Sequence, residues 1–271
     1  MIWNLTKNTA FYALVTLIVV LAVFPFYYAI ITSFKTGSNL FTVEYFPSSF
    51  SLENYVSVIN AGSFTRNLLN SLVVSTLVVL LALLIAVTAS FALARVRFRG
   101  RSLLLLTILS VSMFPQIAVL AGLFEVVRFL GLYNTLWSLV FSYTIFTLPF
   151  TVWVLTTFMR DLPVEIEEAA IIQDIPWWKR MTRIIIPIQK TSIISGFLLP
   201  FMTCLRELTL FMLLCGQGRI ITTMLDYFDE MGLYAFSSGI NLILIVMILL
   251  FNMIVNKLTG ASIDSGIGGG K

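Results

Sequence analysis

Few residues in this chain have the types and spacing that chemistry requires. The sequence has no histidine, which excludes HExxH zinc sites and nucleophiles that depend on a histidine base. Its two cysteines, Cys204 and Cys215, are eleven residues apart, which on one helix is about 16 Å and beyond disulfide reach. No Walker GxxxxGK[ST] motif is present. We therefore predict no catalytic residues, no metal site and no cofactor bound by this chain.

One charged pair, Arg206 and Glu207, lies within an otherwise apolar segment. A charge at the centre of a bilayer costs at least about 2.5–3.5 kcal/mol, so such residues face a partner or water. Adjacent helical positions point about 100° apart, so the two need not pair with each other. Two interpretations stay open: the pair lines a translocation pathway, or it makes a structural bond to another span or to a partner subunit.

Charged and small residues also gather in the polar segment 160–190. Pro163 can open a helix, and Pro176 suits the first turn of a second one. Glutamates crowd the first turns after Pro163, where the helix dipole favours anions: Glu165, Glu167 and Glu168. The pattern predicts a compact helix–turn–helix with small residues that allow close approach by another protein. An interfacial amphipathic hairpin that merely joins two spans fits the residues equally well.

Two tryptophans, Trp177 and Trp178, follow Pro176 beside basic residues. Tryptophan is enriched among the residues that anchor protein interfaces. It is also enriched at the membrane–water boundary. Both roles stay open for this pair.

The composition indicates what must position these residues. Hydrophobic residues make up 59% of the chain and charged residues only 11%, whereas soluble domains average about 25% charged residues. A bilayer accommodates that much apolar surface, provided that the backbone is helical. The fold class that we predict is an all-α integral membrane protein with one transmembrane domain over residues 1–271.

Six segments are long and apolar enough to cross about 30 Å of hydrocarbon. The first is too long for a signal peptide and has no small-residue cleavage site after it, so we interpret it as a retained anchor. The predicted spans are 11–33, 69–94, 103–123, 135–159, 191–215 and 234–256.

The distribution of lysine and arginine predicts the orientation. With a cytoplasmic N-terminus, twelve of the seventeen basic residues lie inside, four lie outside, and Arg206 lies within a span. Both termini and the loop 160–190 are therefore predicted to be cytoplasmic. The inner residues are Lys7, Arg95, Arg97, Arg99, Arg101, Arg160, Lys179, Arg180, Arg183, Lys190, Lys257 and Lys271, and the outer ones are Lys35, Arg66, Arg128 and Arg219.

The loop also carries a family resemblance. Glu168-Ala169-Ala170 is followed by Ile184-Ile185-Ile186-Pro187, with Pro187 nineteen positions after Glu168. This pattern resembles the EAA motif of binding-protein-dependent ABC permeases. That family usually has Asp-Gly where this chain has Gln173-Asp174, so we expect the Ile175-Pro176 break to replace the glycine turn.

The resemblance extends over residues 11–190. Residues 91–100 (FALARVRFRG), 130–135 (LGLYNT) and 146–150 (FTLPF) resemble the six-span permeases of maltose-type carbohydrate uptake. Residues 204–208 (CLREL) stand where sugar permeases carry a Trp-Asn-acidic stretch, and they are more similar to permeases for ferric iron.

The resemblance implies a permease subunit of an ATP-driven ABC importer in a prokaryotic inner membrane, with a carbohydrate as the substrate. Ferric iron or another solute is the alternative, and an ion-coupled carrier, a channel or an intramembrane enzyme are rivals from other classes. The implied partners are a second homologous permease, two ATPase subunits that hold ATP and Mg²⁺, a solute-binding protein and lipid, but no nucleic acid. Contacts with the ATPase are implied for Glu167, Glu168, Ala169, Ala170, Asp174 and Pro187.

Overall fold

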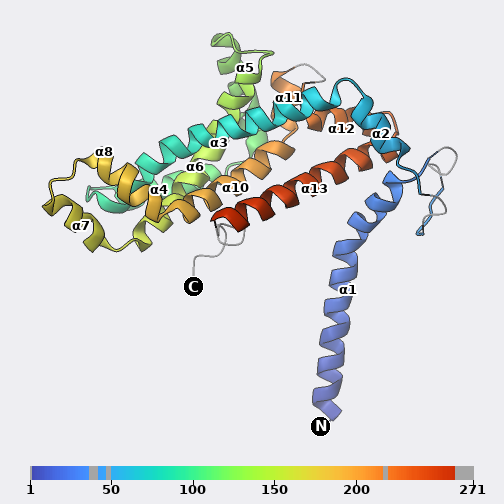
Figure 1. Ribbon diagram of the computed structural model, residues 1–271, viewed down its shortest axis with the longest axis horizontal. Helices are drawn as coiled ribbons and strands as arrows, with labels where there is room; N and C mark the ends of the chain where they lie inside the picture. The colour runs from blue at the N-terminus through green and yellow to red at the C-terminus, as the bar shows by residue number, and fades with distance from the viewer. Residues whose placement is uncertain (1, 37–41, 47–49, 216–218, 260–271) are drawn as a thin grey trace. The chain divides into compact units, whose positions relative to one another are not determined.

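The computed structural model describes residues 2–36, 42–46, 50–215 and 219–259 (Figure 1). Within these ranges every regular element is a helix and none is a strand, which confirms the predicted all-α class. The chain divides into two units, one of Met1–Thr65 with Met224–Met247 and one of Arg66–Thr223 with Ile248–Lys271. A single domain over 1–271 stays a prediction. Lys271, one of the basic residues predicted to lie inside, is outside the described residues.

The first unit contains α1 (Ile2–Ser33), α2 (Glu53–Asn60), most of α12 (Ile221–Glu230) and the first part of α13 (Tyr234–Thr259). Polar contacts fix the end of α1 to α2. The buried Asn54 side chain donates to the carbonyls of Ser33 and Lys35, both at 2.8 Å. The Ser33 hydroxyl lies 2.7 Å from that of Tyr55.

The second unit is built around α6, which packs against α4, α10 and α11. Two apolar clusters fill it, and α3 and α6 contribute to both. Its elements are α3 (Phe64–Arg95), α4 (Arg101–Ser112), η2 (Gln116–Val119), α5 (Leu120–Phe129), α6 (Leu136–Asp161), α7 (Val164–Ile172), α8 (Trp177–Arg180), η3 (Met181–Ile185), α9 (Ile186–Ile188), α10 (Lys190–Arg206) and α11 (Thr209–Leu214). Figure 1 shows α7 and α8 together at one end of this unit.

In the described part of the chain, four helices are each long and apolar enough to cross a membrane: Phe11–Ser33, Phe64–Arg95, Leu136–Asp161 and Tyr234–Lys257. They match four of the predicted spans to within a few residues. Two further pairs of helices meet that test only together, Arg101–Ser112 with Gln116–Phe129 and Trp177–Ile188 with Lys190–Arg206. The predicted count of six is reached when each bent pair is one span.

The predicted span 103–123 is therefore wrong as a continuous helix. It bends by 92° between Ser112 and Gln116. Pro115 has extended backbone angles (φ −60°, ψ 121°). Proline has no N–H to donate and disfavours the helical region for the residue before it, so α4 ends ahead of Pro115.

The predicted span 191–215 is also not continuous. The chain bends by 77° between Ile188 and Lys190, just before the predicted start. Within the span, α10 ends at Arg206 because Glu207 is extended (φ −74°, ψ 132°). Before the first bend, η3 is a turn of π-helix. The ring of Pro187 would clash with the carbonyl four residues earlier, and a wider turn avoids that clash.

Three helices end in the same hydrogen-bonded turn. After α5 and α12, Gly131 (φ 68°) and Gly232 (φ 71°) are left-handed, and crossed backbone bonds close each turn as in a Schellman motif. After α7 the left-handed residue is Asp174 (φ 51°), with Asp174 N–H to Ile171 C=O at 2.9 Å and Ile175 N–H to Ala170 C=O at 3.1 Å. The turn thus forms at the position where the resembling family has glycine. The expectation that Ile175-Pro176 replaces it is wrong, because aspartate tolerates the left-handed region better than most residues.

This turn generates a first prediction. Asp174→Gly should preserve the α7–α8 turn, whereas Asp174→Val should weaken it by about 1–2 kcal/mol, the cost of a left-handed conformation for an L-residue. Hydrogen exchange of peptides from 160–190, measured on the assembled complex, should be faster only for the valine variant. Gln173→Val is the matched control, because Gln173 is exposed and has φ −86°. Equal exchange in all three variants would contradict the assignment.

Candidate functional site

The predicted coupling residues lie on two different sides of α7. Glu168 and Ala169 are exposed, whereas Ala170 is buried and Glu167 leaves only 11% of its side chain exposed. Residues 167 and 170 are three apart and share one side of the helix. The structure therefore brings Glu167 and Ala170 together against the rest of the chain and leaves Glu168 and Ala169 available to a partner.

Glu167 is the polar centre of the inner side. One of its carboxylate oxygens, Oε2, lies 3.2 Å from Nε of Arg95, the last residue of α3. The other, Oε1, lies 4.0 Å from Nη1 of Arg180 in α8. Arg95 also donates from Nη2 to the carbonyl of Leu162 at 2.6 Å. One carboxylate thus connects three parts of the site: the end of α3, the start of the loop and α8.

Apolar contacts hold the second half of the loop. Met181 and Ile185 are 3% and 2% exposed and belong to the cluster that also contains Phe91 of α3 and Leu155 of α6. Trp177 makes an edge-to-face contact with Phe91, with ring centroids 6.2 Å apart. Its neighbour Trp178 is 56% exposed. The loop therefore packs on α3 and α6 as part of their core.

The outer side of the loop has the character of a docking surface. Ile171 and Ile172 are 52% and 82% exposed, next to the small side chain of Ala169 and the carboxylate of Glu168. Asp174 and Pro187 are exposed as well. Large exposed apolar side chains rimmed by charges are typical of protein–protein contacts. The helix–turn–helix that the sequence predicts is present as α7 and α8.

Arg206 and Glu207 have different surroundings at the break between α10 and α11. Oε2 of Glu207 accepts a hydrogen bond from the backbone N–H of Leu210 at 3.1 Å, and Oε1 accepts one from Nε2 of Gln116 at 3.3 Å. The carboxylate therefore caps α11 and ties this break to the one before η2. Arg206 is exposed, and no described carboxylate lies within ion-pair distance of it.

A mostly apolar pocket lies where the α4–α5 bend faces α6. Its lining includes Thr107, Ser110 and Phe114, and from α6 Phe146 and Pro149. Among the described residues, no group of three or more Cys, Asp or Glu side chains could hold a metal ion.

Comparison with known proteins decides the family. The family model for binding-protein-dependent transport system inner membrane components matches residues 79–262. The chain belongs to this family. It is thus a membrane-spanning transport component, as the sequence predicts.

Several members of this family of inner membrane components are similar to the chain. The trehalose/maltose transport system permease protein MalG of Thermococcus litoralis is 33% identical over 208 residues, which cover 76% of this chain and 75% of that protein. The diacetylchitobiose uptake system permease protein DasC of Streptomyces coelicolor is 30% identical over 69% of each chain. A chain of a bacterial ABC transporter that imports the polysaccharide alginate has the same fold, with a TM-score of 0.78, 18% identity, and coverage of 94% and 96%.

The sequence alone does not indicate the partners of Glu167 and Glu207. It predicts Arg95 and Arg180 only as residues that set the topology, and it gives no signal for Gln116. The one available signal was the arginine-rich end of the segment 91–100, which resembles the permeases of this family. That signal does not say that Arg95 turns back to a carboxylate 72 positions later in the chain.

The Arg95–Glu167 contact generates a second prediction. Removing a hydrogen-bonding partner from a largely buried charge costs about 1.5–3 kcal/mol, so Glu167→Gln and Arg95→Gln should each loosen the loop. The double variant should lose less than the sum, because the second change removes a charge that is already unpaired. Thermal unfolding of the detergent-solubilised complex measures both effects. Arg97→Gln, an exposed position on the same segment, is the control, and strict additivity would contradict a direct contact.

Proposed function

We propose that this chain is a permease subunit of an ATP-driven importer for a carbohydrate. The observation that carries the proposal is the similarity, at 33% identity over three quarters of each chain, to a permease named for trehalose and maltose transport. Relatives named for trehalose and diacetylchitobiose transport extend the pattern. The chain would supply part of the translocation pathway and would leave ATP hydrolysis to separate subunits.

The proposed assembly contains a second, homologous permease, two ATPase subunits that bind ATP and Mg²⁺, and a solute-binding protein outside the membrane. In one solved structure with this fold, a bacterial alginate transporter is in complex with a periplasmic protein bound to an alginate pentasaccharide. The exposed outer side of α7 is the surface that we assign to the ATPase. The topology, with both termini and residues 160–190 in the cytoplasm, is part of the same proposal and is supported by the twelve basic residues that it places inside.

The packing of the loop suggests how ATP-driven motion would reach the spans. A docked ATPase would hold Glu168 and Ala169 on the outer side of α7. The inner side of α7 is fixed to α3 through Glu167. Further along the loop, Met181 and Ile185 pack in the apolar cluster with α3 and α6. A displacement of α7 would therefore move these helices as a body, which is the rigid-body type of switch between two states.

The alternatives have less support. The likeness of residues 204–208 to ferric iron permeases rests on Arg206 and Glu207, yet both oxygens of Glu207 already accept hydrogen bonds within the chain. The exposed Arg206 is the residue of this pair that we keep as a candidate for the translocation pathway. Family membership argues against an ion-coupled carrier, a channel and an intramembrane enzyme, since the family consists of components of binding-protein-dependent transport.

The docking assignment generates a third prediction. Glu168→Lys and Ala169→Trp should lower transport and binding-protein-stimulated ATPase activity together. A bulky side chain at a packed contact costs about 1–3 kcal/mol, or roughly 5- to 150-fold in docking affinity. Asp161→Lys, the same charge change at the exposed last residue of α6, should leave both activities close to those of the unmodified complex. Unchanged transport in both α7 variants, in complexes of normal composition, would contradict the assignment.

The substrate class generates a fourth prediction. Reconstituted complex with its own binding protein should take up a radiolabelled disaccharide such as trehalose or maltose only when ATP is inside the vesicle. Unlabelled oligosaccharides should compete, and ferric citrate should not. Uptake of iron without any uptake of sugar would contradict the carbohydrate assignment and would support ferric iron as the substrate.

A further inference from the structure

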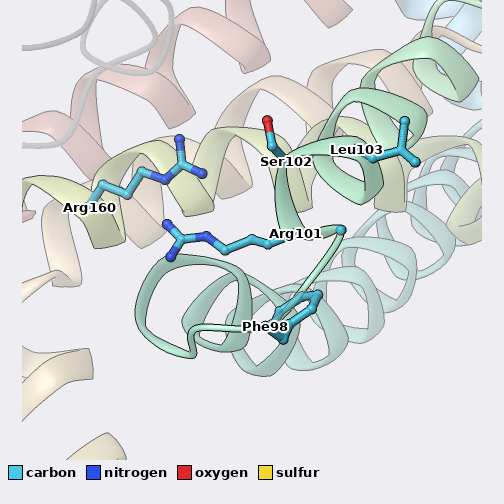
Figure 2. A pocket seen from close by; sticks show the side chains of 6 residues that line it. Phe98, Arg101, Ser102, Leu103 and Arg160 are labelled. Carbon is cyan, nitrogen blue, oxygen red and sulfur yellow. The ribbon is translucent and has the colours of Figure 1, made fainter.

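In the second unit, two arginines near the loop have no carboxylate within ion-pair distance among the described residues. Arg101 is the first residue of α4, and Arg160 is the penultimate residue of α6. Both line an open pocket together with Phe98, Gly100, Ser102 and Leu103. Figure 2 shows the two guanidinium groups extending toward one another from these separate helices.

This arrangement gathers positive charge at one pocket. Two like charges that face each other repel, and an anion between them would turn that repulsion into attraction. In the described part of the chain, no carboxylate lies within ion-pair distance of Arg101 or Arg160. Arg95 and Arg180, by contrast, both have Glu167. The pocket therefore offers a place for an anion that the chain itself does not supply.

Donors around the pocket fit a phosphate group. Arginine presents a planar set of N–H donors that matches phosphate in a bidentate way. The Ser102 side chain lines the same pocket. No side chain caps the N-terminus of α4, so its first backbone N–H groups add to the attraction for an anion.

The surface that leads away from the pocket is apolar. Leu103 and Leu106 are 68% and 62% exposed and, being three positions apart, lie on one face of α4. Leu105 and Ile108 lie on the opposite face of α4 and pack against the apolar cluster that contains Leu155 of α6. A ligand that fits both the basic pocket and this apolar face has a phosphate head and a hydrocarbon tail. Lipid is available there, because α4 and the helices after it together form a segment apolar enough to cross the membrane.

We propose that Arg101 and Arg160 bind the phosphate of an anionic phospholipid, with one acyl chain against Leu103 and Leu106. Basic pockets between transmembrane helices are suited to such head groups. The negative phosphate would offset part of the positive charge of the two arginines beside the start of the loop, in the leaflet on that side of the membrane. The site is independent of the transported substrate.

The test uses the purified complex, delipidated in detergent and titrated with phosphatidylglycerol, with bound lipid counted by native mass spectrometry. Arg101→Gln and Arg160→Gln should each weaken binding of the tightest lipid about fivefold, and the double variant about 25-fold, if each arginine contributes about 1 kcal/mol. Arg101→Lys and Arg160→Lys keep the charge and should retain most of the binding. Arg99→Gln, an exposed arginine two positions before Arg101 that does not line the pocket, is the matched control.

Two further arms identify the source of the phosphate. Phosphatidylcholine, which has no net charge, should bind at least fivefold more weakly, and inorganic phosphate at 10-fold molar excess over the lipid should not displace phosphatidylglycerol. Leu103→Asn should weaken binding of phosphatidylglycerol, because it removes the apolar contact. Equal binding of both lipids, displacement by inorganic phosphate, or an Arg99→Gln effect as large as that of Arg101→Gln would each overturn the proposal. So would disulfide cross-links between cysteines placed at both arginine positions and a cysteine that replaces an acidic residue of the ATPase.

Discussion

The attachment of the 160–190 loop to the second unit depends on the contact between Arg95 and Glu167. It joins the last residue of α3 to the first turn of α7, and the same arginine also binds the carbonyl that ends α6. Without it, the 160–190 segment would be attached by its ends and by the apolar contacts of Met181 and Ile185. With it, the loop is attached through α7 as well as through Met181 and Ile185, so a displacement of α7 is transmitted to α3. The inner side of α7 is used for this attachment, and only the outer side remains for a partner.

The helix breaks obey a second constraint, which comes from the bilayer. Lipid cannot satisfy the backbone groups that a broken helix frees, so the chain must satisfy them itself. Glu207 does this for the N-terminus of α11 and binds Gln116 beside the other break. Thr222 donates to the carbonyl of Glu207 at 3.1 Å. A charge in an apolar segment is thus explained by local backbone needs, and substrate contact is not required to account for it.

The sequence was sufficient for those features that depend on composition and on local pattern. Apolar runs predicted the four continuous spans, and Pro163 and Pro176 predicted where α7 and α8 begin. Features that depend on contacts distant in sequence could not be predicted, because no local pattern indicates that Glu167 faces Arg95. The breaks at Pro115 and Glu207 were missed for another reason: hydropathy averages over a window, and a two- or three-residue interruption leaves the average high. The left-handed turn at Asp174 could not be predicted from the lack of a glycine, because aspartate can adopt the same backbone conformation.

Glu167 and Glu168 show why the motif cannot be treated as one contact surface. They are adjacent, so their side chains leave the helix about 100° apart. One is 11% exposed and bound to α3, while the other is exposed. A substitution at Glu167 would weaken the attachment of the loop to the rest of the chain. A substitution at Glu168 would weaken the contact between the loop and its partner subunit. Both would reduce transport, but only the first would lower the stability of the second unit. The two adjacent glutamates therefore have separate roles: Glu167 attaches α7 to α3, and Glu168 faces the surface proposed for the ATPase.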